Sequence, residues 1–191
     1  MTANVTTTYL EMKNKANFQP KSGFEEMLNM IEIENTAFLN FILFTGVGLP
    51  WSWYSRMKWS EGDWQKYLDN DNSRLFLGMK GKEIIGYCEL EYQENDQVEI
   101  KFFGLLPDYY GTGLGGMLLS HAIKIAWEES TKRLWVHTCS KDSEAALKNY
   151  LSRGFEIYKE ETLPEKIPSE NELLGHISNF FKWYRNKYVP K

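Results

Sequence analysis

Two hydrophobic periodicities divide the chain into expected strands and helices. Alternation of apolar and polar positions, rich in β-branched and aromatic residues, predicts strands over residues 5–12, 74–79, 84–92, 99–105, 133–139 and 155–158. Apolar residues three and four positions apart predict helices over residues 24–45 (in two pieces), 117–126, 144–151 and 170–188. Ser60, with Asp63 three residues later, predicts the start of another short helix.

Length and composition fit a globular protein with a real core. The 191 residues suit one domain with a small appendage, and 42% of them are hydrophobic. No apolar run is long enough to span a membrane, and the first residues lack a secretory pattern, so we expect a cytoplasmic protein without a membrane partner. A net charge of −4 argues against a nucleic-acid surface. Scattered histidines and two distant cysteines predict free thiols and no metal site.

A glycine loop after one predicted strand carries the most specific chemistry. Strand 99–105 is followed by a five-residue bridge (106–110) and then by glycines at 111, 113, 115 and 116, directly before a helix. Glycine tolerates positive φ and close ligands, and the free N–H groups of a helix N-terminus attract anions. The loop therefore predicts a pyrophosphate-binding site.

Two common pyrophosphate loops do not fit this segment. In a dinucleotide-binding fold the strand runs almost directly into the first glycine, whereas five residues intervene here. The phosphate loop of nucleotidases ends in Gly-Lys-Ser/Thr, and Gly115-Gly116-Met117 lacks the lysine.

Two ordered motifs resemble the GNAT superfamily of N-acetyltransferases. The family pattern Gln/Arg-x-x-Gly-x-Gly/Ala is similar to Tyr110-Gly111-Thr112-Gly113-Leu114-Gly115. The second pattern, Asn-x-x-Ala-x-x-x-Tyr-x-x-x-Gly-Phe, is similar to a segment with Ser143, Ala146, Tyr150, Gly154 and Phe155. The resemblance covers about residues 74–158. It implies one domain over residues 1–165 and a C-terminal helical extension over 166–191, packed on the domain or at a homodimer interface.

The implied fold is α/β (α+β), with a mixed, mostly antiparallel twisted sheet flanked by helices, splayed central strands and an extra C-terminal helix. The implied activity is direct transfer of an acetyl group from acetyl-CoA to a primary amine of a small molecule or peptide, without a metal. The cofactor would contact Phe103, Gly104, Leu105, Tyr110, Gly111, Thr112, Gly113, Leu114, Gly115, Gly116, Ser143 and Tyr150. Tyr110 and Ser143 depart from the family pattern, which leaves a longer acyl donor open. The alternative is a non-catalytic acyl-CoA-binding or interaction domain on the same fold.

The resemblance also suggests catalytic groups. Tyr150 lies where the family often places a phenol near the sulfur, so we expect it to protonate the leaving thiolate. Glu99 is the favoured base, ahead of Glu91, Glu89 or a water molecule, and it would need a raised pKa. His137 is a tempting base, but its position on a strand is more typical of a core histidine.

An aromatic segment is expected to form the acceptor site. Trp53 and Trp59 could bind an amine cation or an apolar group. Arg56 could hold a substrate carboxylate, and Glu91 is expected to contact the acceptor.

Overall fold

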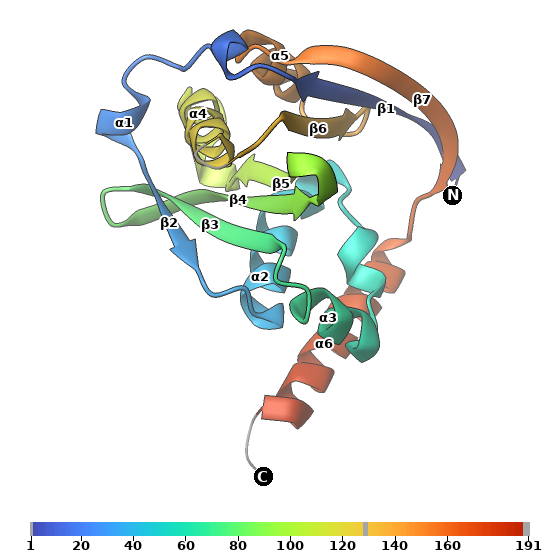
Figure 1. The fold of residues 1–191 in the computed structure, drawn as a ribbon. Helices are drawn as coiled ribbons and strands as arrows, with labels where there is room; N and C mark the ends of the chain where they lie inside the picture. The colour runs from blue at the N-terminus through green and yellow to red at the C-terminus, as the bar shows by residue number, and fades with distance from the viewer. Residues whose placement is uncertain (1, 128–129, 189–191) are drawn as a thin grey trace.

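The computed structural model describes residues 2–127 and 130–188 as seven strands and six α-helices. The strands form one sheet in the order β2-β3-β4-β5-β6-β1-β7 (Figure 1). Among the strands of the described residues, β5 and β6 alone are parallel, and every other neighbouring pair is antiparallel. This confirms the mixed, mostly antiparallel sheet. The strands are β1 (Thr2–Met12), β2 (Asn29–Ile33), β3 (Ser73–Lys80), β4 (Glu83–Gln93), β5 (Gln97–Leu105), β6 (Arg133–Cys139) and β7 (Glu156–Lys166).

Helices cover both faces of the sheet (Figure 1). Helices α4 (Leu114–Ala126) and α5 (Glu144–Ser152) lie on one face, and α2 (Ala37–Gly48), α3 (Glu61–Leu68) and α6 (Glu170–Tyr188) lie on the other. The largest apolar cluster lies between α4 and the sheet, and it includes Leu90, Ile100, Leu119, Leu134 and Val136. None of the helices described here has the length and apolar character needed to cross a bilayer.

The segment expected to be two helices over residues 24–45 is interrupted by a strand. Only a single turn, α1 (Phe24–Met27), precedes β2, and α2 begins at Ala37. The segment 29–33 pairs along its whole length with β3, from Asn29–Met79 to Ile33–Leu75. The prediction was wrong here because a partner 40 or more residues away supplies the backbone hydrogen bonds, which local periodicity does not reveal.

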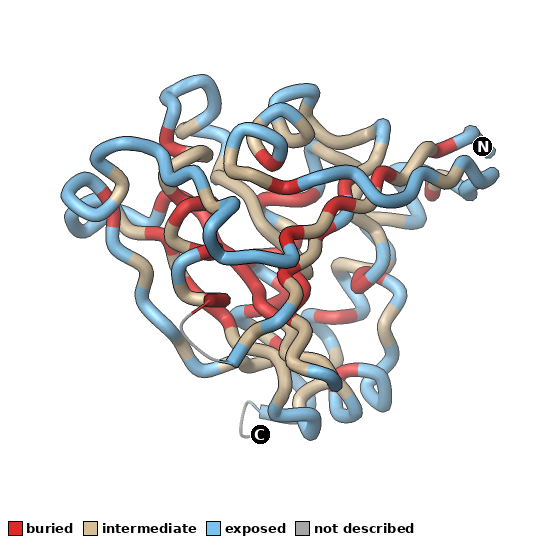
Figure 2. The backbone as a smooth tube through the Cα atoms, turned by 45° about the horizontal axis from the view of Figure 1, so that its top comes forward, coloured by how far each residue is buried: buried red, intermediate tan, exposed pale blue. Residues whose placement is uncertain are grey.

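The first strand lies inside the sheet rather than at its edge. β1 pairs antiparallel with β6 on one side and with β7 on the other. Figure 2 shows buried residues concentrated in the interior of the molecule, while Thr2 and Asn4 near the N-terminus are exposed. The strand expected to begin near residue 155 continues through Lys166 because β1 provides a partner along most of that length.

The C-terminal helix packs against the domain in this structure. Ser169 and Glu172 form reciprocal hydrogen bonds at its start, as their spacing predicted. Phe180 stacks on Phe41, with 3.8 Å between ring centroids, and also contacts Trp64. Residues 189–191 of the expected extension lie outside the described part of the chain, and the homodimer stays a prediction.

Candidate active site

The site is built at a fork between the two parallel strands. β5 and β6 pair from Gln97–Arg133 as far as Ile100–Val136. Beyond that point β5 stays with β4, while β6 stays with β1. Within the described residues, no strand pairs with the β6-facing edge of β5 after Ile100. The expected splayed central strands are therefore present, and the fork leaves a stretch of β5 backbone facing open space.

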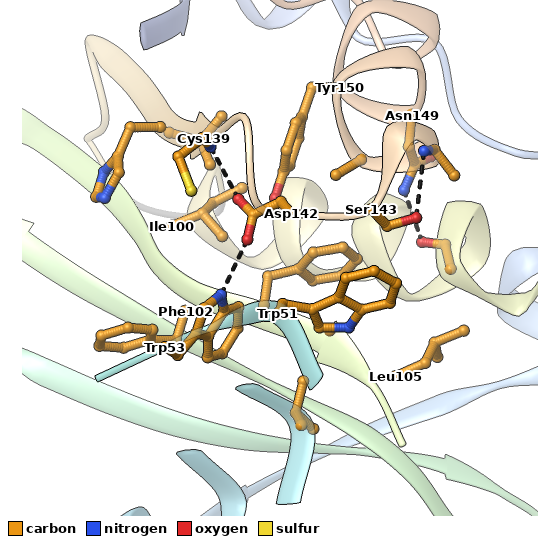
Figure 3. Close-up of a pocket in the computed structure, with 18 of the residues that line it drawn as sticks. Trp51, Trp53, Ile100, Phe102, Leu105, Cys139, Asp142, Ser143, Asn149 and Tyr150 are labelled. Atoms are coloured by element: carbon orange, nitrogen blue, oxygen red, sulfur yellow. Dashed lines mark hydrogen bonds between the residues drawn. The ribbon is translucent and has the colours of Figure 1, made fainter. Parts of the chain in front are cut away.

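A cavity of about 720 Å³ occupies this fork. Its walls come from two directions (Figure 3). Cys139, Asp142, Ser143, Asn149 and Tyr150 approach from β6, α5 and the loop between them, whereas Trp51, Trp53, Phe102 and Leu105 approach from β5 and the segment after α2. Val5 and Thr7 of β1 also line the cavity. The volume lies in the range typical of small-molecule sites.

The glycine loop forms one end of the cavity. Gly111 and Gly113 have φ of 72° and 80°, a conformation in which a residue with a Cβ would be strained. Gly113 precedes α4 and offers no side chain to its first N–H groups, and no acidic residue lies in the first turn. Five of the predicted loop residues line the cavity, namely Tyr110, Gly111, Gly113, Gly115 and Gly116. The other two do not: the Thr112 hydroxyl donates to the Tyr109 carbonyl, and Leu114 is buried.

Three cations line the cavity, two of them beside Gly116, and their part in the site is not evident from the sequence. Lys21, Lys148 and Arg153 line the cavity, and none pairs with a carboxylate of the described residues. A Cβ on Gly116 would lie 2.8 Å from a guanidinium nitrogen of Arg153. Burial lowers the pKa of Arg153, as expected for a cation without a counter-charge. Lys148 lies on α5 and Arg153 directly follows that helix, whereas Lys21 comes from a loop distant in sequence.

The two departures from the family pattern have structural partners. The Tyr110 hydroxyl accepts a hydrogen bond from Trp51 Nε1 at 2.9 Å. Ser143 caps α5 by accepting from the Ala145 N–H at 3.2 Å, and it also lines the cavity. These contacts order the cavity wall, and the nearby cations add charge that neither side chain supplies.

Tyr150 is buried and lines the middle of the cavity, together with the predicted strand residues Phe103, Gly104 and Leu105. Burial raises the pKa of its phenol above the ordinary value, and the charge of Asp142 raises it further. The phenol therefore stays protonated at neutral pH. It can donate a hydrogen bond to a charged group in the cavity.

Glu99 and His137 form a pair at the base of the fork. Glu99 is 1% exposed, and its Oε2 accepts from Lys101 Nζ at 2.9 Å and from Gln93 at 3.2 Å. Its Oε1 lies 3.2 Å from His137 Nδ1, close enough for an ion pair, but accepts no hydrogen bond of good geometry from the described residues. Burial raises the pKa of Glu99, but the contacts with His137 and Lys101 outweigh it and lower the pKa overall. The raised pKa required of a Glu99 base is contradicted.

His137 is not the core histidine that its strand position suggested. Its side chain is 41% exposed and lines the cavity, whereas Glu99 does not. The alternation along β6 places Leu134, Val136 and Thr138 in the core and turns His137 to the opposite face.

Arg56 and Glu89 are buried structural partners rather than acceptor-site residues. Their bidentate ion pair has N–O distances of 2.5 and 2.6 Å, with side chains 2% and 0% exposed. Asn40 and the Tyr67 hydroxyl complete the network around Glu89. The prediction that Arg56 binds a substrate carboxylate is wrong because the guanidinium is committed elsewhere, and the rival base Glu89 is removed for the same reason.

The other predicted acceptor residues separate into two groups. Trp53 lines the cavity and donates from Nε1 to Asp142 at 3.0 Å, which joins the segment after α2 to the loop after β6. Trp59 lies outside the cavity, against Trp64 and Tyr67. Glu91 also lies outside it, 3.4 Å from Lys101. The sequence identified the aromatic segment but not which rings face the cavity.

The forked sheet and the glycine loop define the class of protein. The model of the acetyltransferase (GNAT) family matches residues 29–155, more than half of the chain. The chain therefore belongs to the GNAT family of acetyltransferases, and it is an acyltransferase.

Relatives agree with this assignment. An uncharacterized N-acetyltransferase of Mycobacterium tuberculosis is 26% identical over 115 residues, which cover 60% of this chain and 73% of the relative. A GCN5-related N-acetyltransferase from Kribbella flavida shares the fold at a TM-score of 0.59 and 13% identity, over 90% of this chain but only 62% of that protein, less than two thirds. An aminoglycoside acetyltransferase from an uncultured soil sample, in complex with sisomicin, gives a TM-score of 0.51 at 15% identity, over 68% and 90% of the two chains.

Proposed function

We propose that this protein transfers an acetyl group from acetyl-CoA directly to a primary amine of a small molecule or peptide. One observation carries the proposal. A single cavity joins a strand edge without a partner strand, an uncapped helix N-terminus, cations that pair with no carboxylate of the described residues, and a buried phenol. In acyl-CoA, the amide-bearing arm, the pyrophosphate and the thioester match these features in that order.

The residues of the cavity fit the donor. The pantetheine arm would lie along β5 at Phe103, Gly104 and Leu105, where its amides could hydrogen-bond to the strand. The pyrophosphate would bind the N–H groups at the start of α4, where the helix dipole favours an anion. Lys21, Lys148 and Arg153 would neutralise the phosphate charges.

Transfer would need little covalent participation by the protein. The amine nitrogen attacks the thioester carbonyl, the C–S bond breaks, and the electron pair leaves on sulfur. Tyr150 would donate a hydrogen bond to that sulfur. Its raised pKa makes complete proton transfer to a thiolate unfavourable, since an ordinary thiol has a pKa of about 8.5. Stabilisation by hydrogen bonding is therefore its proposed role.

The opposite end of the cavity favours an acceptor with an apolar or aromatic portion. Trp53, Tyr54 and Phe102 line it. The carboxylate of Asp142 accepts from Trp53 and Thr138, and that of Glu165 accepts from Lys141. Few carboxylates remain for a polycation such as the sisomicin bound to the soil enzyme.

A two-part experiment tests this function. Calorimetry should show saturable CoA binding, and a panel of amines screened by thermal shift with CoA present should identify an acceptor. Tyr150→Phe should then lower kcat by about 10²-fold, the lower range for such groups, while CoA binding is retained. CoA binding without turnover on the whole panel would instead favour the non-catalytic alternative, and absent CoA binding would refute both.

A further inference from the structure

We infer that His137 is the proton acceptor for the attacking amine and that Glu99 is the residue that positions it. This inference rests on the proposed function and deepens it. Its basis is the placement of the pair at the fork. Ile100 and Val136 are the last paired residues of β5 and β6, so His137 is the first residue of β6 inside the fork.

The position of the His137 ring leaves one nitrogen away from Glu99. Nδ1 of His137 faces Glu99 Oε1 at 3.2 Å. Nε2 makes no hydrogen bond to the described residues, and the exposed side chain lines the cavity. A buried carboxylate beside Nδ1 favours the tautomer that carries its proton there, and in that tautomer Nε2 presents a lone pair. This arrangement of a base oriented by a third group recurs in catalytic sites.

Glu99 itself is poorly suited to accept the proton. Its carboxylate is buried, does not line the cavity, and holds a contact to Lys101 in addition to His137. A carboxylate with a lowered pKa is a weak base, but it stabilises a positive charge on the neighbouring ring. In this pair, His137 is the accessible proton acceptor and Glu99 is its buried counter-charge.

Other titratable groups lie on the strands around the ring and bear on its pH dependence. Tyr9 on β1 contacts the His137 ring, and Lys159 on β7 lies over the Tyr9 ring. Lys101 on β5 forms an ion pair with Glu91 on β4, and Cys139 lies two residues after His137 on β6. Only Glu99 lies within 4 Å of a ring nitrogen as a charged partner among the described residues.

The proposed step balances without another reactant. The ammonium of the acceptor loses one proton to Nε2 of His137, and the neutral nitrogen forms its bond to the carbonyl carbon. When the C–S bond breaks, sulfur takes the electron pair. The second proton of the nitrogen neutralises the thiolate, and the imidazolium returns its proton to solvent.

The test measures kcat/KM and kcat from pH 5 to 10 with an amine found active in the panel. His137→Ala should lower kcat by about 10²-fold or more and remove the acid limb of the pH profile, since base catalysis typically contributes 10²- to 10⁴-fold. Added imidazole should restore part of the rate, because the exposed position leaves room for it. Glu99→Gln should keep CoA affinity but shift the acid limb. His176→Ala on α6, away from the cavity, is the matched control.

Each outcome decides the inference. If His137→Ala raises only KM, keeps the pH profile and gains nothing from imidazole, then His137 binds the acceptor and is not its base. In that case the proposed function survives through the active wild-type enzyme. If wild-type protein releases no CoA with any amine, the proposed function and this inference are both refuted.

Discussion

Replacing Arg56 by methionine should destabilise the protein more than most single substitutions. The change leaves the Glu89 carboxylate, 0% exposed, without the guanidinium that contacts both of its oxygens at 2.5 and 2.6 Å. Breaking a buried ion pair from one side costs about 3–5 kcal/mol, because the remaining charge stays out of water. For a chain of this length that corresponds to a decrease in Tm of roughly 6–20 °C.

Denaturant titration of four proteins tests this magnitude. Arg56→Met combined with Glu89→Gln should cost clearly less than Arg56→Met alone, since the uncompensated charge is removed while Asn40 and Tyr67 keep an acceptor. Arg185→Met on exposed α6 makes the same chemical change and should stay within about 0.5 kcal/mol of wild type. A cost below about 1 kcal/mol for Arg56→Met, or a double variant less stable than the single one, would refute the reasoning.

Three further predictions follow from local geometry. Gly86→Ala places a Cβ 2.2 Å from the Gly104 carbonyl oxygen. Calorimetry should therefore show weaker CoA binding, and denaturation should show that the protein loses about 1–3 kcal/mol of stability. Gly175→Ala has open space around it and should instead stabilise α6 by up to about 1 kcal/mol. Arg153→Gln should raise the Kd for CoA and reduce its dependence on salt, and an unchanged salt dependence would contradict a phosphate contact. Hydrogen bonds at Ser169 lower the pKa of Glu172 from 4.5 to about 2. The carboxylate therefore contributes stability above pH 4.5, and this contribution is lost as the pH falls towards 2. In denaturation experiments the stability of Glu172→Gln should equal that of wild type only at the acid end of this window.

The parts of the site that depend on short segments could be predicted from sequence. Positive φ at Gly111 and Gly113, the start of a helix after them, and Tyr150 one turn before Gly154 are all properties of fewer than a dozen neighbouring residues. The same is true of the Ser60 cap, whose hydrogen bonds to Asp63 are present. Their local chemistry is sufficient because the neighbouring backbone fixes their geometry.

The roles that depend on distant partners could not be predicted in this way. Arg56 was expected to face substrate, and only its contact with Glu89, 33 residues away, shows that it is buried. Glu99 lies beside His137 only because β5 pairs with β6, and no local pattern in the sequence indicates that contact. Residues that appear separate in sequence acquire their function from the sheet register, which local patterns do not specify.

The central position of β1 has a consequence for how the protein folds. Hydrogen bonds join Thr6 to a residue 134 positions later and Thr8 to one 152 positions later. Such contacts raise the mean sequence separation of the native structure, and chains dominated by them fold slowly. β1 is synthesised before β6 and β7, yet it can pair only after both of them have been made. We therefore expect the cavity wall that holds Val5 and Thr7 to close late in folding, after the part of the sheet formed by β2 to β5.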